Sequence, residues 1–267
     1  MTDIVPSYIL KLDRAQEHLH VFKSEIQAFV TSHPYAVAKR REGKEEVWRL
    51  RFTSQIPAHI SLVGADFVHN VRSALDHLTA ALVPASRRDS TYFPIFWEGV
   101  WGPAVEGEKK QVSDDRAKWN TITKKMKPEA VEILKTFQPY AGYTPVSEQT
   151  HLLDSLNRLW NTDKHSQLPF LVEALSNCAI TWTKADGSIE TFYDREPGGL
   201  GNDAKLPNPG GGVDVQIEGT VKVAIRVANP DGYIELPHHF DGIMDYARQV
   251  VLGLVPFIHV TPGHVRS

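Results

Sequence analysis

Apolar residues recur at three- and four-residue spacing near the start of the chain, which predicts a long amphipathic helix. The helix begins after Pro6-Ser7 and ends before His33-Pro34. Its apolar positions are Ile9, Leu12, Ala15, Leu19, Phe22, Ile26 and Phe29. The same spacing predicts a second helix over 57–83, bounded by prolines. Alternation of apolar and polar residues between the two helices predicts a strand over 47–52.

The pattern changes along the rest of the chain. Helical spacing continues in three further segments, 117–126, 128–137 and 148–161. Strand-like alternation then begins, and 178–184 and 188–194 read as a hairpin around Ala185-Asp186-Gly187. Further strands are predicted over 213–217, 221–227 and 233–236, followed by a helix over 240–258. The segment 197–212 is rich in Gly, Pro and Asn and is predicted to be a mobile loop.

This order of elements predicts an α+β fold: a helical bundle with a small antiparallel sheet in the C-terminal half and a closing C-terminal helix. We expect residues 1–172 to form the bundle that carries the site. Residues 173–267 then form the β hairpins and the last helix, packed on the bundle as one unit. A chain of 267 residues is long enough to bury a substantial core.

Composition narrows the function further. The net charge of −3 gives no global field that favours RNA or an anionic membrane, so a nucleic acid would need a local basic patch. Short basic runs at Lys39-Arg40-Arg41 and Lys124-Lys125-Lys127 could contact a phosphate backbone, although such runs are typical of solvated faces. The lone Cys178 excludes an intramolecular disulfide and is expected to be buried in a strand. No leader peptide or membrane-spanning run is seen, which predicts a cytoplasmic protein without a membrane partner.

The polar face of the second helix is unusual. At about 100° per residue, Asp66, Asn70, Ser73 and His77 form one stripe, with His69 and Asp76 beside it. Solvated helix faces more often carry Lys, Glu, Gln and Arg, so this composition indicates a site. Arg72 lies between the polar and apolar faces and can reach the stripe or pair with Asp76 one turn on. A solvent face held by Arg–Asp pairs remains the alternative.

The helix before residue 165 repeats this layout. One face carries Asp154, Asn157, Arg158, Asn161 and His165, with Asp163 and Lys164 next to the histidine. We expect the two polar faces to meet across a shared cleft. Imidazoles beside cations suit metal-free phosphodiester cleavage. A metal site between helices is the less favoured chemistry, because Glu-x-x-His pairs are missing and neighbouring cations oppose a divalent ion. No metal or cofactor is therefore predicted.

The run Arg72-Ser73-Ala74-Leu75-Asp76-His77 resembles the Arg-x4-His motif of HEPN (higher eukaryotes and prokaryotes nucleotide-binding) domains. Those domains are helical bundles, and many are metal-independent RNases of toxin, anti-phage and RNA-processing systems. The resemblance implies that Arg72 and His77 form the catalytic pair, with Ser73 as the polar neighbour, and that a homodimer brings two pairs together. The strand-rich half departs from a minimal HEPN domain.

A longer pattern also resembles a known family. It comprises His69-Asn70-Val71-Arg72-Ser73-Ala74-Leu75-Asp76-His77-Leu78, then Phe93-Pro94-Ile95, then Asn161-Thr162-Asp163-Lys164-His165. Proteins with this pattern occur in actinobacteria and their phages, and the resemblance implies no established activity.

The leading hypothesis is a metal-independent endoribonuclease of HEPN type, acting in phage–host conflict or a toxin system, with Arg72 and His77 as catalytic residues. The supporting residues would be Asp66, His69, Asn70, Ser73, Asp76, Asp154, Arg158, Asn161, Asp163, Lys164 and His165. A non-catalytic protein that binds a nucleotide, another anion or a partner is the alternative hypothesis. In a third interpretation, the polar stripe is a hydrogen-bond network that ties the helices together.

Overall fold

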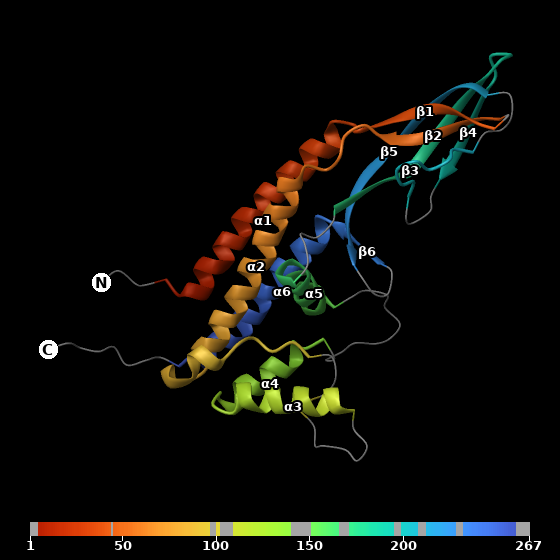
Figure 1. The fold of residues 1–267 in the computed structure, drawn as a ribbon. Coiled ribbons are helices and arrows are strands. Elements are labelled where there is room, and N and C mark those ends of the chain that lie inside the picture. The colour runs from red at the N-terminus through yellow and green to blue at the C-terminus, as the bar shows by residue number, and fades with distance from the viewer. Residues whose placement is uncertain are drawn as a thin grey trace. The chain divides into compact units, whose positions relative to one another are not determined.

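A computed structural model gives the fold (Figure 1), and it describes residues 5–43, 45–96, 100–101, 109–139, 151–165, 171–194, 199–207, 212–227 and 232–259. At 163–165, 172, 212, 226–227 and 232–234 the description covers the backbone alone. Helices and two antiparallel sheets confirm the predicted α+β class.

The contacts within the chain divide it into two units. The helical unit comprises Met1–His20, Val63–Leu168 and His239–Ser267. The sheet unit comprises Val21–Leu62 and Pro169–His238. Segments of the two units alternate along the sequence, so the boundary predicted at residue 172 does not by itself separate them. We describe each unit separately.

The helices agree with the hydrophobic pattern. They are α1 (Ser7–Thr31), α2 (Ala58–Ala81), α3 (Lys110–Thr123), α4 (Pro128–Thr136), α5 (Leu152–His165) and α6 (His238–Leu254), with short 3-10 helices η1 (Ala85–Ser90) and η2 (Val255–Phe257). Two starts differ: α3 begins at Lys110 rather than at residue 117, and α5 begins at Leu152 rather than at residue 148. The first turns of α3 are polar and show no apolar period. A Gln111–Asp115 side-chain hydrogen bond of 2.9 Å links neighbouring turns there.

The core of the helical unit is built around α2. Most of its predicted apolar face is buried, with no exposed area at Phe67, Val71, Ala74, Leu75 and Leu78, although Val63 is half-buried. Phe67 stacks on Phe240 of α6, with ring centroids 4.7 Å apart. One face of α6 is likewise buried, while Leu252 is exposed. The 3.6-residue period therefore identified correctly which side of α2 and of α6 faces the core.

The sheet unit contains β1 (Tyr35–Glu42), β2 (Glu45–Phe52), β3 (Leu171–Lys184), β4 (Ile189–Asp194), β5 (Gly212–Val227) and β6 (Gly232–Leu236). β1 and β2 form a hairpin, and the larger sheet has the order β4-β3-β5-β6. The predicted hairpin of β3 and β4 is confirmed. Trp48 of β2 meets Trp182 of β3 edge-on at 5.7 Å, and Trp182 is fully buried.

The strands differ from the predictions in three places, and the first is β3, which begins at Leu171 rather than at residue 178. β1 was not predicted, because Lys39-Arg40-Arg41 gives its second half no apolar face. Cross-strand ion pairs, such as that of Lys39 with Glu46, support it instead. The segments 213–217 and 221–227 are one strand, β5, which continues opposite a bulge in β3. Asn177 in that bulge has a φ of 50°, and Cys178 beside it is buried, as expected.

The described part of the predicted mobile loop, 199–207, is held in place by hydrogen bonds. The Leu50 N–H donates to the Ala204 carbonyl at 2.9 Å, and the Leu206 N–H donates to the Trp48 carbonyl at 2.9 Å. Leu200 pairs with Leu175 of β3 in the same way, through an isolated bridge. The segment therefore covers the outer edge of β2, which a search for turn residues could not reveal.

One half-buried network in the helical unit contains a histidine, His151, whose side chain takes part in two contacts. His151 Nδ1 accepts the Leu153 N–H at 3.2 Å, and its Nε2 lies 3.3 Å from the Tyr246 hydroxyl. That hydroxyl donates to the Phe137 carbonyl at 3.0 Å. This arrangement requires a neutral imidazole with its proton on Nε2. Burial lowers the pKa of His151 below its usual 6.5, against the opposing charge of Asp154.

Because the pKa of His151 is lower in the folded state than in the unfolded state, the unfolded chain binds more protons as the pH falls. We expect the His151 contribution to stability to be complete above pH 6.5 and to be lost as the pH falls through the folded-state value. The variant His151→Asn keeps an acceptor for the Leu153 N–H but does not titrate. Urea unfolding of both proteins between pH 8 and 5 measures the free energy of unfolding at each pH. This free energy should fall less in the variant than in the wild type, and an equal fall in both would contradict the role given to His151.

Candidate functional site

The polar stripe on α2 faces outward in the helical unit. Asp66, His69 and His77 are exposed, and the neighbouring polar residues Asn70, Ser73 and Asp76 are half-buried. Asn70 Nδ2 donates to the Asp66 carbonyl at 2.8 Å, a bond within the helix itself. These residues therefore do not form a closed network inside the bundle. His77 and Asp76, at the C-terminal end of the stripe, are the members that line a pocket.

Arg72 is not part of the polar stripe, and its side chain is buried. Only 5% of the residue is exposed, and its Nη2 donates to the Phe93 carbonyl at 2.8 Å. The pairing with Asp76 that the sequence suggested is present, at 3.3 Å between Nη2 and Oδ1. The same Asp76 Oδ1 accepts the Phe93 N–H at 2.8 Å. Arg72 and Asp76 thus bind both backbone polar groups of Phe93.

The far end of the Phe93 segment is fixed by Gln138, which has no exposed area. Its Nε2 donates to the Pro94 carbonyl at 3.1 Å, and its Oε1 accepts the Phe96 N–H at 3.1 Å. Arg72, Asp76 and Gln138 together form what we call the Phe93 clamp. Through the clamp, an Arg and an Asp on α2 hold the segment that contains Phe93 against the helix.

The ion pair in the clamp is largely removed from water. Burial lowers the pKa of Arg72, although the Asp76 charge opposes the shift. Burial also raises the pKa of Asp76, against the Arg72 charge and the Phe93 N–H. The Arg72 guanidinium lies 5.3 Å from the Trp160 ring of α5, and its Nε and Nη1 have no hydrogen-bond partner among the described residues. A buried pair of this kind depends strongly on both members.

The polar face of α5 is only partly described. Asp154 is buried, and its Oδ2 pairs with Arg158 Nε at 2.6 Å. Asn161 is exposed. The side chains of Asp163, Lys164 and His165 lie outside the described residues, so a cleft between the two polar faces stays a prediction.

A pocket of about 480 Å³ in the helical unit includes the end of the polar stripe, and we call it the His77 pocket. Its polar lining comprises Ser7 of α1, Asp76 and His77 of α2, Arg88 and Asp89 of η1, Thr91 and His259. Its apolar lining comprises Pro6, Tyr8, Ala80, Ala81 and Ile258. Four separate parts of the chain therefore bring two imidazoles, a guanidinium, two carboxylates and three hydroxyl-bearing side chains to one cavity.

Local contacts fix the two histidines of this pocket. His77 Nδ1 lies 2.9 Å from the Ser7 hydroxyl, which leaves Nε2 available. The His259 backbone N–H donates to the Ala81 carbonyl at 2.9 Å, which anchors it beside the end of α2. Its Nε2 is a buried atom with no hydrogen-bond partner among the described residues. An unsatisfied buried nitrogen suits a ligand that supplies a donor or an acceptor.

Sequence reasoning found His77 and Asp76 but missed the other polar residues of the pocket. Ser7 and His259 lie far from α2 in sequence, whereas Arg88 follows it in η1, and none of the three belongs to a motif. The paired arginines before residue 89 were visible, but no local pattern shows that residue 259 returns to residue 81. Only the packing of α6 and η2 against the bundle brings His259 there.

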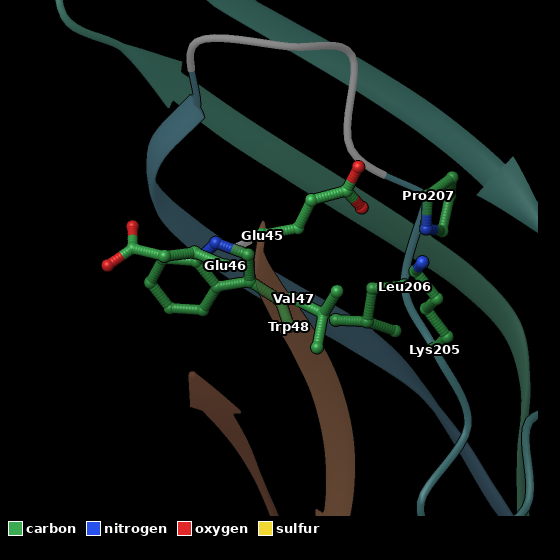
Figure 2. A pocket seen from close by; sticks show the side chains of 7 residues that line it. All are labelled: Glu45, Glu46, Val47, Trp48, Lys205, Leu206 and Pro207. Carbon is green, nitrogen blue, oxygen red and sulfur yellow. The ribbon is translucent and has the colours of Figure 1, made fainter. Parts of the chain in front are cut away.

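A second pocket, of about 690 Å³, lies in the sheet unit (Figure 2). It is lined by Glu45, Glu46, Val47, Trp48, Lys205, Leu206 and Pro207. The two carboxylates outnumber the single lysine, and Glu46 already pairs with Lys39 of the basic run on β1. Lys39 also lies 5.4 Å from the Trp48 ring. The His77 pocket also carries two carboxylates and one cation, but the pocket of the sheet unit has no imidazole in its lining and therefore suits proton transfer less well.

The described residues include no group of three or more His, Cys, Asp or Glu side chains placed to hold a metal ion. Within the same part of the chain, no helix combines the length and the apolar character needed to cross a membrane. Comparisons with protein-family models, curated proteins and solved structures find no match for this chain.

Proposed function

We propose that this chain cleaves RNA at the His77 pocket, using imidazoles for proton transfer and no metal ion. The observation that carries the proposal is that His77, His259 and Arg88 line the same cavity. Metal-free cleavage of a phosphodiester needs a base, an acid and a cation beside the phosphate. The resemblance of the α2 motif to HEPN domains supports the same reaction class.

The reaction uses groups already present in RNA. One imidazole takes the proton from the ribose 2′-hydroxyl, whose oxygen attacks the adjacent phosphorus. The other imidazole donates a proton to the departing 5′-oxygen as its bond to phosphorus breaks. The products are a 2′,3′-cyclic phosphate and a 5′-hydroxyl, and no further reactant is required. We assign these steps to His77 Nε2, because Ser7 engages only Nδ1, and to His259 Nε2, which is buried and has no hydrogen-bond partner among the described residues.

In this proposal Arg88, rather than Arg72, binds the phosphate. Arg72 is 5% exposed and holds the Phe93 carbonyl, so we assign it a positioning role through the clamp. Arg88 lines the pocket directly. The pocket also contains two acidic side chains. Asp76 is engaged with Arg72 and the Phe93 N–H, and Asp89 is exposed to solvent.

RNA cleavage in EDTA, measured on a labelled oligonucleotide, tests the proposal. We expect His77→Ala, His259→Ala and Arg88→Ala each to lower the cleavage rate by on the order of 10²-fold or more. His20→Ala, an exposed histidine on α1, and Arg87→Ala, the neighbour of Arg88 in η1, should cleave like the wild type. A cyclic phosphate on the 5′ fragment should be found by mass spectrometry.

Two outcomes would overturn the proposal: a wild type that leaves RNA intact, or pocket variants that cleave as fast as the control variants. If a nucleotide raises the melting temperature of the wild type and RNA is never cleaved, the chain is a binding protein.

A further inference from the structure

The Ser7–His77 hydrogen bond has a chemical consequence that RNA cleavage does not use. Ser7 Oγ lies 2.9 Å from His77 Nδ1, and both side chains line the His77 pocket and are exposed. A hydroxyl within hydrogen-bond reach of an imidazole is the arrangement of an activated nucleophile, because the imidazole can take the hydroxyl proton as the oxygen attacks. In RNA cleavage the nucleophile belongs to the substrate, so this pair is unused.

The position of Ser7 in the fold supports a nucleophilic role. Ser7 is the first residue of α1, a helix of 25 residues. The backbone N–H groups of Ser7 and Tyr8 therefore have no acceptor within the helix, and the positive end of its dipole lies at the Ser7 side chain. Tyr8 lines the same pocket. Backbone N–H groups beside a nucleophile are suited to stabilising a negative oxygen in a tetrahedral intermediate.

The rest of the pocket leaves room for a small substrate. Its volume of about 480 Å³ lies within the usual range for ligand sites. Next to the pair, Ala80 and Ala81 of α2 give the wall short side chains. The first turn of α1 is held by the bond from the Ile9 N–H to the Pro6 carbonyl, at 3.0 Å, which keeps Ser7 in place.

We propose that Ser7 and His77 form a nucleophile–base pair, and that the pocket hydrolyses small activated carboxylic esters through an acyl-Ser7 intermediate. Ser7 Oγ attacks the carbonyl carbon and its proton passes to His77 Nδ1. The bond to the alcohol oxygen breaks, and that oxygen takes the proton from His77. A water molecule then attacks the acyl group, its proton passes through His77 to Ser7, and the carboxylic acid is released.

The test uses 4-nitrophenyl acetate as the probe and follows release of 4-nitrophenolate by absorbance. We expect the wild type to hydrolyse it on the order of 10²-fold faster than Ser7→Ala or His77→Ala. Ser24→Ala and His20→Ala, exposed positions on α1, should match the wild type. Mass spectrometry of a protein sample quenched in acid should locate an acetyl group on Ser7. All these side chains are exposed or half-buried, so the variants should fold.

Equal rates in wild type and Ser7→Ala, or acetylation confined to other residues, would overturn this proposal. The result is independent of the RNA experiment, although both use His77. An acetyl ester brings no phosphate, and its hydrolysis needs the Ser7 hydroxyl, which the proposed RNA cleavage does not use. A chain that hydrolyses the ester but not RNA disproves only the proposed ribonuclease function, and the reverse result disproves only the role of Ser7.

Discussion

Replacing Arg72 with Met should destabilise the protein by about 3–5 kcal/mol, which is typical when one member of a buried ion pair is removed. The variant keeps a long unbranched side chain but leaves the Asp76 carboxylate without its cation and the Phe93 carbonyl without its donor. Arg14→Ala is the matched control, because Arg14 pairs with Glu17 on the surface and 59% of its side chain is exposed. That change should cost less than about 1 kcal/mol. Urea unfolding of both variants measures the difference.

A second substitution separates the ion pair from the other contacts of Arg72. Asp76→Asn keeps an oxygen that can accept the Phe93 N–H but removes the charge. If the uncompensated carboxylate causes most of the loss, Arg72→Met should cost less in the Asp76→Asn background than in the wild type. Equal costs for Arg72→Met and Arg14→Ala would contradict the clamp. So would loss of RNA cleavage in a fully stable Arg72→Met, which would instead support a direct catalytic role.

The clamp shows how far the α2 motif could be interpreted from sequence. Helical spacing placed the apolar residues of α2 correctly and indicated that Arg72 could pair with Asp76, because both inferences rest on local geometry. The carbonyl that Arg72 binds belongs to Phe93, on a segment with no regular structure. A helix period gives the direction of a side chain but does not identify what lies in that direction.

The pocket and the sheet edge illustrate the same limit over longer distances. His259 enters the His77 pocket through a backbone bond to Ala81, and the segment 199–207 follows β2 through bonds to Trp48 and Leu50. These pairings join residues more than a hundred positions apart. Their backbone groups are common to every residue type, so the sequence carries little trace of them. The composition of 199–207 predicted a mobile loop, because Gly and Pro are frequent in loops, whereas hydrogen bonds hold this segment in place.

Replacing Gly199 with Ala should cost about 2–4 kcal/mol, because two penalties coincide at this residue. Its φ of +63° is a conformation that residues with a Cβ atom adopt only with strain. A Cβ atom would also lie 2.7 Å from the Leu175 carbonyl oxygen. That oxygen accepts the Leu200 N–H at 2.7 Å, so moving it disturbs the bridge between the 199–207 segment and β3.

Two further glycines separate these penalties. Gly187 in the β3–β4 turn has a φ of +80° and open space around it, so Gly187→Ala should show the conformational strain alone, about 1–2 kcal/mol. Gly201 has neither a positive φ nor a close neighbour, and Gly201→Ala should be neutral or slightly stabilising. Unfolding free energies should therefore fall in the order Gly201→Ala, Gly187→Ala, Gly199→Ala. If Gly199→Ala costs no more than Gly187→Ala, the close approach to Leu175 does not hold this segment on the sheet.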